Sequence, residues 1–317
     1  MGNTKVHDVI MIGAGPSALA AAIYTTREDI ETVLIEKGVV GGLAAITDQV
    51  DNYPGFEEGV TGLALAEKLE KQAERFGAQI EYDEVAGIEQ GDKGAIVVRT
   101  FGGDKKAKAV LISTGSDYKK IGVPGEEEFY GRGVHYCATC DGAFYRGKKL
   151  AVVGGGNSAV QEALFLTRFT THIDLLVRSK LRASEVLQKE LQKAVHEGKI
   201  TVHLGAVTDE IVGKDNLVEK VLVTQNGNKK EFKVDGVFIF VGLLPNTQFL
   251  ADSTIELDEV GFIKTDANLM TKIPGVFASG DVRSGATMQI ASAVGEGATA
   301  ALKIREYLEG REAHPQD

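Results

Sequence analysis

The chain has 317 residues, of which 43% are apolar and 25% are charged, a composition typical of a packed protein with two domains rather than of a disordered chain. Its formal net charge of −10 and the lack of a long basic run argue against nucleic acid as a partner. Residues 1–8 lack the layout of a signal peptide and no apolar run is long enough to span a bilayer, so the sequence predicts a cytoplasmic protein without a membrane segment.

Two segments share one layout of apolar strand, glycine-rich turn and helix. They are residues 8–18 (DVIMIGAGPSA) and 149–159 (KLAVVGGGNSA). In such a turn the backbone can approach a diphosphate closely, and the N-terminus of the helix points at it. One glycine-rich turn is weak evidence, but two copies in the same context indicate two nucleotide-binding folds. The candidate binding residues are Gly13, Gly15 and Ala18 in the first copy and Gly154, Gly156 and Ser158 in the second.

The second strand of each copy should end where the adenosine ribose of a dinucleotide lies. We expect these strands at Thr32–Glu36 and Ile173–Arg178. Glu36 can accept hydrogen bonds from ribose hydroxyls and would repel a 2′-phosphate, so the first site suits FAD or NAD. Arg178, at the matching place, favours the extra phosphate of NADP, the alternative being a solvated charge at a strand end. The sequence therefore favours NADP over NAD at the second site.

Each copy is followed by a stretch that alternates apolar and polar residues around glycine-rich turns. These stretches, residues 81–114 and 201–240, predict short antiparallel strands. Glycine and proline then mark two crossovers between domains, near residues 115–124 and 241–247. Close to the C-terminus we expect a buried strand at 275–281 with Asp281 at its end, and after it a helix from Gln289 to Leu308.

The only two cysteines, Cys137 and Cys140, lie three residues apart in the segment HYCATCDG. A Cys-x-x-Cys pair of this kind cycles between dithiol and disulfide. A zinc site would need four ligands, and only His135 is close by, so no metal is expected. Two inert buried thiols would not explain the adjacent Asp141, which is a candidate for proton transfer. The competing role for Asp141 is to form a turn before Gly142.

These residues together resemble the low-molecular-weight, bacterial-type thioredoxin reductases, and the resemblance covers essentially the whole chain. The cysteine motif with the Asp-Gly that follows it is the most specific part. The other matching segments are Gly13–Ala18, Asp51–Gly55, Ser113–Gly115, Gly154–Ala159, Val241–Thr247 and Gly280–Asp281.

The resemblance implies an α/β fold with two Rossmann-like nucleotide-binding domains of the three-layer ββα type, one inserted into the other. The FAD domain would be discontinuous, at residues 1–116 and 246–317, and residues 117–245 would form the NADPH-binding-like domain that carries the cysteines. A homodimer is implied as well. Residues at matching positions would bind FAD, and these are Gly13, Gly15, Glu36, Gly42, Asn52, Thr114, Gly115, Asp281 and Gln289.

The activity implied by the resemblance is thioredoxin-disulfide reduction. In that family FAD takes a hydride from NADPH and reduces the disulfide, and the inserted domain rotates so that both can reach the flavin. Carried over to this chain, Cys140 would face the flavin and Cys137 would attack the disulfide of a thioredoxin-like protein.

The chain departs from the family pattern at three places. The segment Val177–Arg182 is one residue shorter than the usual His-Arg-Arg cluster, and it retains Arg178 and Arg182 as candidate binders of the 2′-phosphate. Leu43 and Met288 replace a glutamine and an arginine. Two alternatives therefore stay open: a related flavoenzyme that uses ferredoxin or another donor in place of NADPH, and a non-catalytic flavin-binding regulatory protein.

Overall fold

The computed structural model describes residues 5–47 and 49–313, and its internal contacts divide the chain into two compact units. Unit 1 comprises Met1–Asp117 and Leu244–Asp317, and unit 2 comprises Tyr118–Leu243. The segments that join the units contain the strands β7 (Ser116–Tyr118) and β16 (Leu243–Pro245), which pair with each other. Across the described residues, no helix is long and apolar enough to cross a membrane.

Unit 1 is built on a seven-stranded sheet in the order β3-β2-β1-β6-β5-β4, with β17 beside β6. Strand β6 explains this arrangement. Its first half pairs antiparallel with β5, and its second half pairs parallel with β17, which takes the edge that β5 leaves. The strands are β1 (Val6–Ile12), β2 (Thr32–Glu36), β3 (Gln79–Tyr82), β4 (Val85–Gln90), β5 (Ile96–Thr100), β6 (Lys105–Ile112) and β17 (Val276–Ala278).

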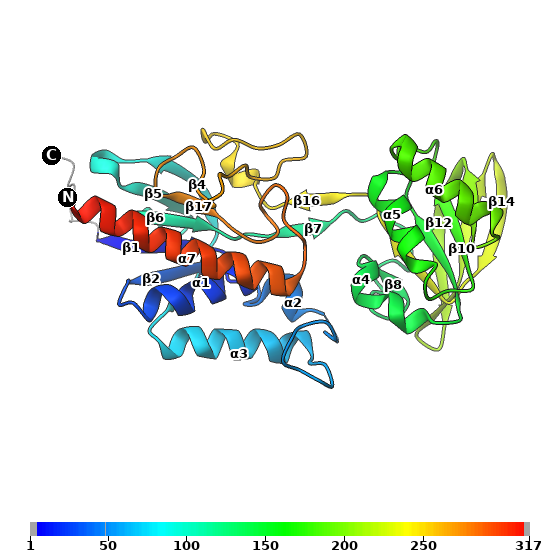
Figure 1. Cartoon of the computed structure of the whole chain (residues 1–317), viewed down its shortest axis with the longest axis horizontal. Helices are drawn as coiled ribbons and strands as arrows, with labels where there is room; N and C mark the ends of the chain where they lie inside the picture. The colour runs from blue at the N-terminus through cyan, green and yellow to red at the C-terminus, as the bar shows by residue number, and fades with distance from the viewer. Residues whose placement is uncertain (1–4, 48, 314–317) are drawn as a thin grey trace. The chain divides into compact units, whose positions relative to one another are not determined.

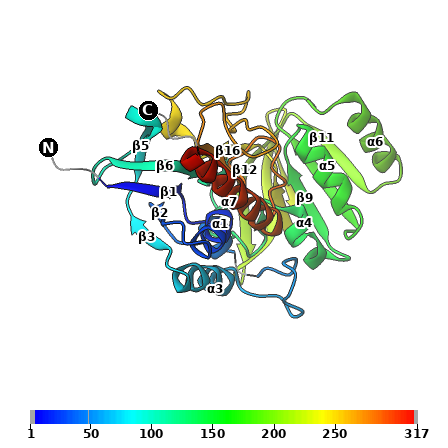
Figure 2. The same cartoon turned by 60° about the vertical axis from the view of Figure 1, so that its left-hand side comes forward.

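Alternate side chains of unit 1's central strands face two different layers. Val9 and Met11 belong to the apolar core that contains residues of the helices α1, α3 and α7, whereas Ile10 and Ile12 belong to the core that contains residues of β4 and β5. Figures 1 and 2 show these helices along one face of the sheet. The helices are α1 (Pro16–Thr26), α2 (Gly42–Ala45), α3 (Gly62–Arg75) and α7 (Ile290–Ala313), with short 3₁₀ turns at Asp92–Gly94 and Gln248–Leu250.

Unit 2 repeats this plan with a five-stranded parallel sheet in the order β11-β10-β9-β15-β8. The helices α5 and α6 cover one face, and a three-stranded antiparallel sheet, β12-β13-β14, covers the other. The parallel strands are β8 (Val134–His135), β9 (Lys149–Val153), β10 (His172–Val177), β11 (Ile200–Leu204) and β15 (Gly236–Ile239). The other elements are α4 (Ala138–Asp141), a 3₁₀ turn (Gly142–Tyr145), α5 (Asn157–Leu166), α6 (Glu185–His196), β12 (Ala206–Lys214), β13 (Leu217–Gln225) and β14 (Asn228–Lys233).

The same alternation is present in unit 2. Leu150 and Val152 pack in the core with the helices, and Ala151 and Val153 pack in the core with β12 and β13. The predicted fold class, an α/β chain with two Rossmann-like ββα units, is therefore confirmed.

The expectation of antiparallel strands throughout residues 81–114 and 201–240 is only partly right. In the second stretch β11 and β15 belong to the parallel sheet. Helix α6 carries the chain back before β11, and a strand that follows a crossover helix lies parallel to its neighbour. Strand β15 is buried along its whole length, so it lacks the polar half of the alternation.

The boundaries of three elements also differ from the expected ones. Strand β10 ends at Val177, so Arg178 follows the strand rather than closing it. The predicted strand at 275–281 is reduced to Val276–Ala278, and the last helix starts at Ile290 and continues to Ala313.

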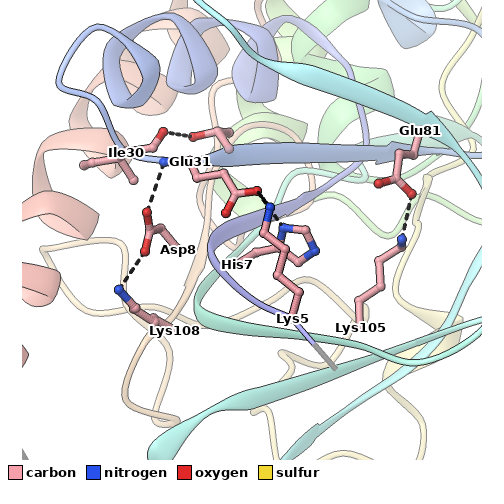
Figure 3. Close-up of polar contacts among 9 residues, drawn as sticks. Lys5, His7, Asp8, Ile30, Glu31, Glu81, Lys105 and Lys108 are labelled. Atoms are coloured by element: carbon pink, nitrogen blue, oxygen red, sulfur yellow. Dashed lines mark hydrogen bonds and ion pairs between the residues drawn. The ribbon is translucent and has the colours of Figure 1, made fainter. Parts of the chain in front are cut away.

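Charged pairs gather where the parallel strands of unit 1 begin (Figure 3). Glu31 precedes β2 and contacts Lys5 and His7, and Lys108 contacts Asp8 at 2.7 Å. Burial opposes the ionisation of Glu31, but hydrogen bonds from Lys5 and His7 outweigh it and lower the pKa of this carboxyl below its usual value. This edge is therefore held by ion pairs, and the opposite edge, where the strands end, carries the glycine-rich turn.

Candidate functional site

The first glycine-rich turn uses its two glycines for different purposes. Gly13 has φ +95°, and a Cβ there would lie 2.6 Å from the carbonyl oxygen of Ser113 at the end of β6. Gly15 precedes α1 and has extended backbone, and a Cβ on it would meet nothing within 4 Å. Gly13 thus allows the turn to pack against the sheet, whereas Gly15 leaves open space in front of the first N–H groups of α1, as an anion requires.

The second turn repeats this division. A Cβ on Gly154, whose φ is +147°, would lie 2.4 Å from the carbonyl oxygen of Phe240, whereas a Cβ on Gly156 would meet nothing within 4 Å. Gly156 caps α5, so space again lies open at a helix N-terminus. The sequence repeat therefore corresponds to a repeat in how the individual glycines pack.

The remaining small residues of the two turns are placed differently from one another. Ala18 is fully buried in the core under the turn, where its size allows the helix to pack closely on the sheet. Ser158 is exposed on the first turn of α5. Of these two expected binding residues, only Ser158 presents its side chain to solvent.

Glu36 lies beside the first turn, as the spacing predicts. One carboxylate oxygen accepts a hydrogen bond from Ala14 N (2.7 Å) and the other from Gly38 N (2.7 Å). Gly42 begins α2, and a Cβ on it would find the Cα of Gly15 at 3.9 Å. The fold thus brings together Gly15, Glu36 and Gly42 at the carboxyl ends of β1 and β2.

Residues far apart in the sequence complete this edge of unit 1. Asn52 donates a hydrogen bond to Gln289 Oε1 (3.1 Å) across 237 positions of the sequence. Thr114 donates to Asn246 O (2.7 Å), and Gly115, with φ +67°, has open space where a Cβ would be. Asn52 belongs to residues 51–59, which line a cavity of about 820 Å³.

Asp281 lies just beyond β17 in unit 1. Burial, and to a lesser degree the negative charge of Glu296, raises its pKa to about 6. Glu296 is itself engaged by Arg283 and accepts a hydrogen bond from Gly280 N (2.8 Å). A Cβ on Gly280 would lie 3.0 Å from Ser17 Cβ, so this segment packs directly on α1.

These observations test whether unit 1 fits FAD. A diphosphate needs open space at a helix N-terminus, which Gly15 leaves, and ribose and ribityl hydroxyls need acceptors, which Glu36 and Asp281 supply. The residues present therefore fit the cofactor that the sequence predicts.

A buried chain of hydroxyls supports the same edge, and sequence reasoning missed it. Ser279 Oγ lies 2.7 Å from Ser17 Oγ and 3.0 Å from Ser113 Oγ, and all three residues are buried. These hydrogen bonds link α1, β6 and the segment that leads to Asp281. Serines carry no periodicity, so no signal in the sequence marks them.

The cationic segment after β10 lies next to the second turn. Arg182 N donates to Gly155 O (2.7 Å), and Ser184 N donates to Asn157 Oδ1 (2.8 Å) at the start of α5. The side chains of Arg178 and Arg182 are both exposed. Positive charge is therefore presented beside the second turn.

Cys137 and Cys140 form a disulfide in unit 2, with their Cα atoms 5.3 Å apart. Cys137 comes two residues after strand β8 and caps the one-turn helix α4, which contains Cys140. Cys140 N donates a hydrogen bond to Cys137 Sγ (3.2 Å). This contact ties the sulfur of Cys137 to the backbone of the helix that carries its partner.

Asp141 follows Cys140 directly and lies beside a buried histidine. Its Oδ2 is 3.2 Å from His135 Nδ1, and His135 Nε2 is 2.7 Å from Tyr145 Oη. Burial, then the charges of Asp141 and Asp235, raises the pKa of Tyr145. In the sequence His135 counted only as a possible zinc ligand, and its pairing with Asp141 and Tyr145 could not be read from their spacing.

Comparison with known proteins agrees with this geometry. The sequence profile of the pyridine nucleotide-disulphide oxidoreductase family matches residues 7–297. Thioredoxin reductase of Bacillus subtilis (strain 168) is 43% identical over 312 residues, which is 98% of this chain and 97% of that protein. Thioredoxin reductase of Listeria monocytogenes is 42% identical over 311 residues, with 96% and 95% covered. The crystal structure of thioredoxin reductase from Streptococcus pyogenes MGAS5005 matches with a TM-score of 0.90 at 40% identity, over 97% of this chain and 100% of that one.

The two glycines of the first turn should respond differently to alanine. Gly15→Ala is expected to leave the free energy of unfolding within about 1 kcal/mol of wild type but to weaken flavin binding, because the methyl group enters the open space. Gly13→Ala should destabilise the fold by more than about 1 kcal/mol, because it meets Ser113 O at a positive φ. Urea unfolding and flavin content after dialysis measure both effects. Equal unfolding curves for the two variants would contradict the assignment.

The raised pKa of Asp281 predicts a pH-dependent stability of the flavin-free protein. The pKa of Asp281 in the folded state, about 6, exceeds its value in the unfolded state. The free energy of unfolding therefore falls as the pH rises from about 4 to 6, and it stays lowered by the full amount above pH 6. Asp281→Asn should therefore stabilise the flavin-free protein by up to about 3 kcal/mol at pH 7.5 and by almost nothing at pH 4. Urea unfolding at both pH values measures this. A variant no more stable than wild type at pH 7.5 would refute the prediction.

Proposed function

The chain belongs to the pyridine nucleotide-disulphide oxidoreductase family, and it matches thioredoxin reductases over nearly its full length. We therefore propose that it is a thioredoxin-disulfide reductase. Its Cys137–Cys140 pair would reduce the disulfide of a thioredoxin-like protein, with NADPH as the electron source and FAD as cofactor. The observation that carries the proposal is a disulfide that lies just after the edge strand of unit 2's parallel sheet and is directly followed by a carboxylate.

We assign FAD to residues 1–116 and 246–317, and NADPH to residues 117–245. When bound, FAD would relay two electrons from a nicotinamide to a disulfide. The chain's own residues would bind and orient it. The N-terminus of α1 would hold the diphosphate, Glu36 the ribose, and Asp281 the ribityl hydroxyls. Asn52, Thr114, Gly115 and Gln289 lie along the same edge of unit 1 and would complete the site.

Reduction of the partner would be a dithiol–disulfide exchange. The thiolate of Cys137 attacks one sulfur of the partner's disulfide, forming a mixed disulfide and releasing one partner thiolate. The thiolate of Cys140 then attacks Cys137 Sγ, which re-forms the Cys137–Cys140 bond and releases the second partner thiolate. Two protons leave the enzyme's thiols and two are taken up by the partner's sulfurs. Asp141, next to Cys140, would accept and return one of them.

We infer a homodimer in the cytoplasm, supported by similarity to the bacterial thioredoxin reductases. Light scattering during size-exclusion chromatography measures the oligomeric state, and a mass equal to one chain would reject the homodimer.

Serine substitutions separate the roles of the two cysteines. Cys137→Ser and Cys140→Ser should each lower NADPH-dependent reduction of thioredoxin by at least about 100-fold, because neither variant can form the internal disulfide. Cys140→Ser should still form a stable mixed disulfide with thioredoxin activated by an aromatic thiol, and Cys137→Ser should not. Thr139→Ala, an exposed change between them, is the control. Turnover by either cysteine variant at the wild-type rate would show that the reaction does not need this pair, whereas a wild-type protein without turnover would favour the non-catalytic, regulatory alternative.

The electron donor is tested by anaerobic titration of the flavin with NADPH, NADH and reduced ferredoxin. NADPH should bleach it most readily, and Arg178→Ala or Arg182→Ala should weaken NADPH binding about tenfold or more by removing a charge-assisted contact. Lys189→Ala, on the exposed side of α6, is the matched control. If the flavin stays oxidised with NADPH but bleaches with reduced ferredoxin, then ferredoxin is the electron donor in place of NADPH, and the proposed disulfide chemistry is unaffected.

A further inference from the structure

His135 occupies the edge strand of unit 2's parallel sheet, two residues before the first cysteine. Strand β8 pairs with β15, where His135 is opposite Phe238. The histidine side chain is 8% exposed, so both of its ring nitrogens must find partners inside the protein. The partners are Tyr145 Oη, 2.7 Å from Nε2, and Asp141 Oδ2, 3.2 Å from Nδ1.

Tyr145 bears on which atoms of this group carry protons. Its raised pKa, caused by burial and then by Asp141 and Asp235, keeps the phenol protonated at neutral pH. The Tyr145 hydroxyl lies 2.7 Å from His135 Nε2, and His135 Nδ1 lies 3.2 Å from Asp141 Oδ2. The neutral tautomer that satisfies both contacts accepts from the hydroxyl at Nε2 and carries its proton on Nδ1, the nitrogen that faces Asp141.

Aromatic packing holds the ring in this orientation. His135 stacks on Phe238 at 5.1 Å between ring centroids, and Tyr145 meets both rings edge-on, at 5.4 and 5.6 Å. Two other charged groups border the cluster. Asp235 accepts a hydrogen bond from Lys149 N (2.9 Å), and Lys148 Nζ lies 5.6 Å from the Tyr145 ring centroid.

The orientation of Asp141 favours proton transfer over the competing role of turn former. A turn-forming aspartate bonds to backbone N–H groups one to three residues ahead. In the described part of the chain, the Asp141 side chain instead contacts His135, through Oδ2 and Nδ1. The carboxylate is 22% exposed, so it also has access to water.

We propose that His135 is a positioning residue for the disulfide chemistry, acting through Asp141. With Tyr145 it holds the carboxylate beside Cys140 in one orientation, and it presents an N–H that balances the negative charge. The proton that leaves a thiol S–H passes to the carboxylate oxygen, which returns it to a leaving thiolate, so His135 gains and loses no proton itself. The inference rests on the proposed function, since it assigns a role within the same exchange reaction.

The test uses the full-length, flavin-loaded protein and two readouts. One is the single-turnover rate at which oxidised thioredoxin reoxidises the reduced dithiol. The other is the pH dependence of iodoacetamide alkylation after reduction with dithiothreitol. His135→Phe keeps an aromatic ring but removes both nitrogens, and it should lower the single-turnover rate about 10- to 100-fold. It should also move the pH midpoint of alkylation upward by about half a pH unit. The reason is that His135 no longer holds the Asp141 carboxylate, and its N–H no longer balances the negative charge beside the thiols.

Two milder variants keep the proposal testable if His135→Phe folds poorly. Tyr145→Phe removes only the hydroxyl that fixes the tautomer and should lower the rate about 3- to 10-fold. His135→Asn keeps an N–H near the position of Nδ1 and should recover most of the rate. His203→Phe is the matched control, because His203 also lies 2.7 Å from an aspartate, Asp174, and packs on Phe232, but on β11 at the other edge of the sheet.

Non-additivity is the decisive outcome. Asp141→Asn should lose as much rate as His135→Phe, and the double variant should be no slower than Asp141→Asn alone. Folded His135 variants with wild-type rates and alkylation profiles, or a further loss in the double variant, would overturn the proposal. Alkylation requires neither NADPH nor thioredoxin. A shifted alkylation midpoint in a protein that fails to reduce thioredoxin would therefore reject the proposed function and retain the role of His135.

Discussion

The structure depends on one close approach that occurs twice. The first glycine of each turn packs against the carbonyl oxygen that ends a neighbouring strand, Ser113 O for Gly13 and Phe240 O for Gly154. Any side chain there would push the turn off the sheet and tilt the helix that follows. Because this contact fixes the helix N-terminus, the open space at Gly15 and Gly156 lies at a defined place in front of each helix, as the proposed binding of a diphosphate requires.

The disulfide depends on a weaker element, a two-residue edge strand, and buried polar contacts compensate for its shortness. Glu126 is almost fully buried and accepts hydrogen bonds from Tyr136 Oη (2.7 Å), Ile121 N (2.9 Å) and Gly122 N (2.7 Å). Tyr136 immediately precedes Cys137, and its ring stacks on Tyr118 at 5.1 Å. The turn at residues 121–126 and the cysteine loop are thereby tied together within unit 2.

Sequence patterns predicted the features that depend on local chain properties. The glycine-rich turns, strand β2 and the Cys-x-x-Cys pair follow from periodicity and spacing. The structure places Glu36 and Gly42 beside the first turn and pairs Asn52 with Gln289, and their assignment to a single site stays a prediction. Strands β11 and β15 were expected to be antiparallel but lie in the parallel sheet. The crossover helix α6 makes β11 parallel to its neighbour, and β15 is buried along its whole length, unlike a half-exposed antiparallel strand. The chain of Ser17, Ser113 and Ser279 spans positions that only the tertiary fold brings together.

The polarity of the parallel sheets explains why the chemistry of both units lies where it does. In unit 1 the strands begin among ion pairs such as Asp8–Lys108 and end at open glycines and carboxylates. In unit 2 the strand β8 likewise ends at His135, immediately before the cysteine loop. Carboxyl ends of parallel strands leave loops that adjacent strands hold close together, so groups from several segments can meet there. The contact between His135 and Asp141 follows this rule, since β15 holds the histidine and the cysteine loop returns the aspartate to it.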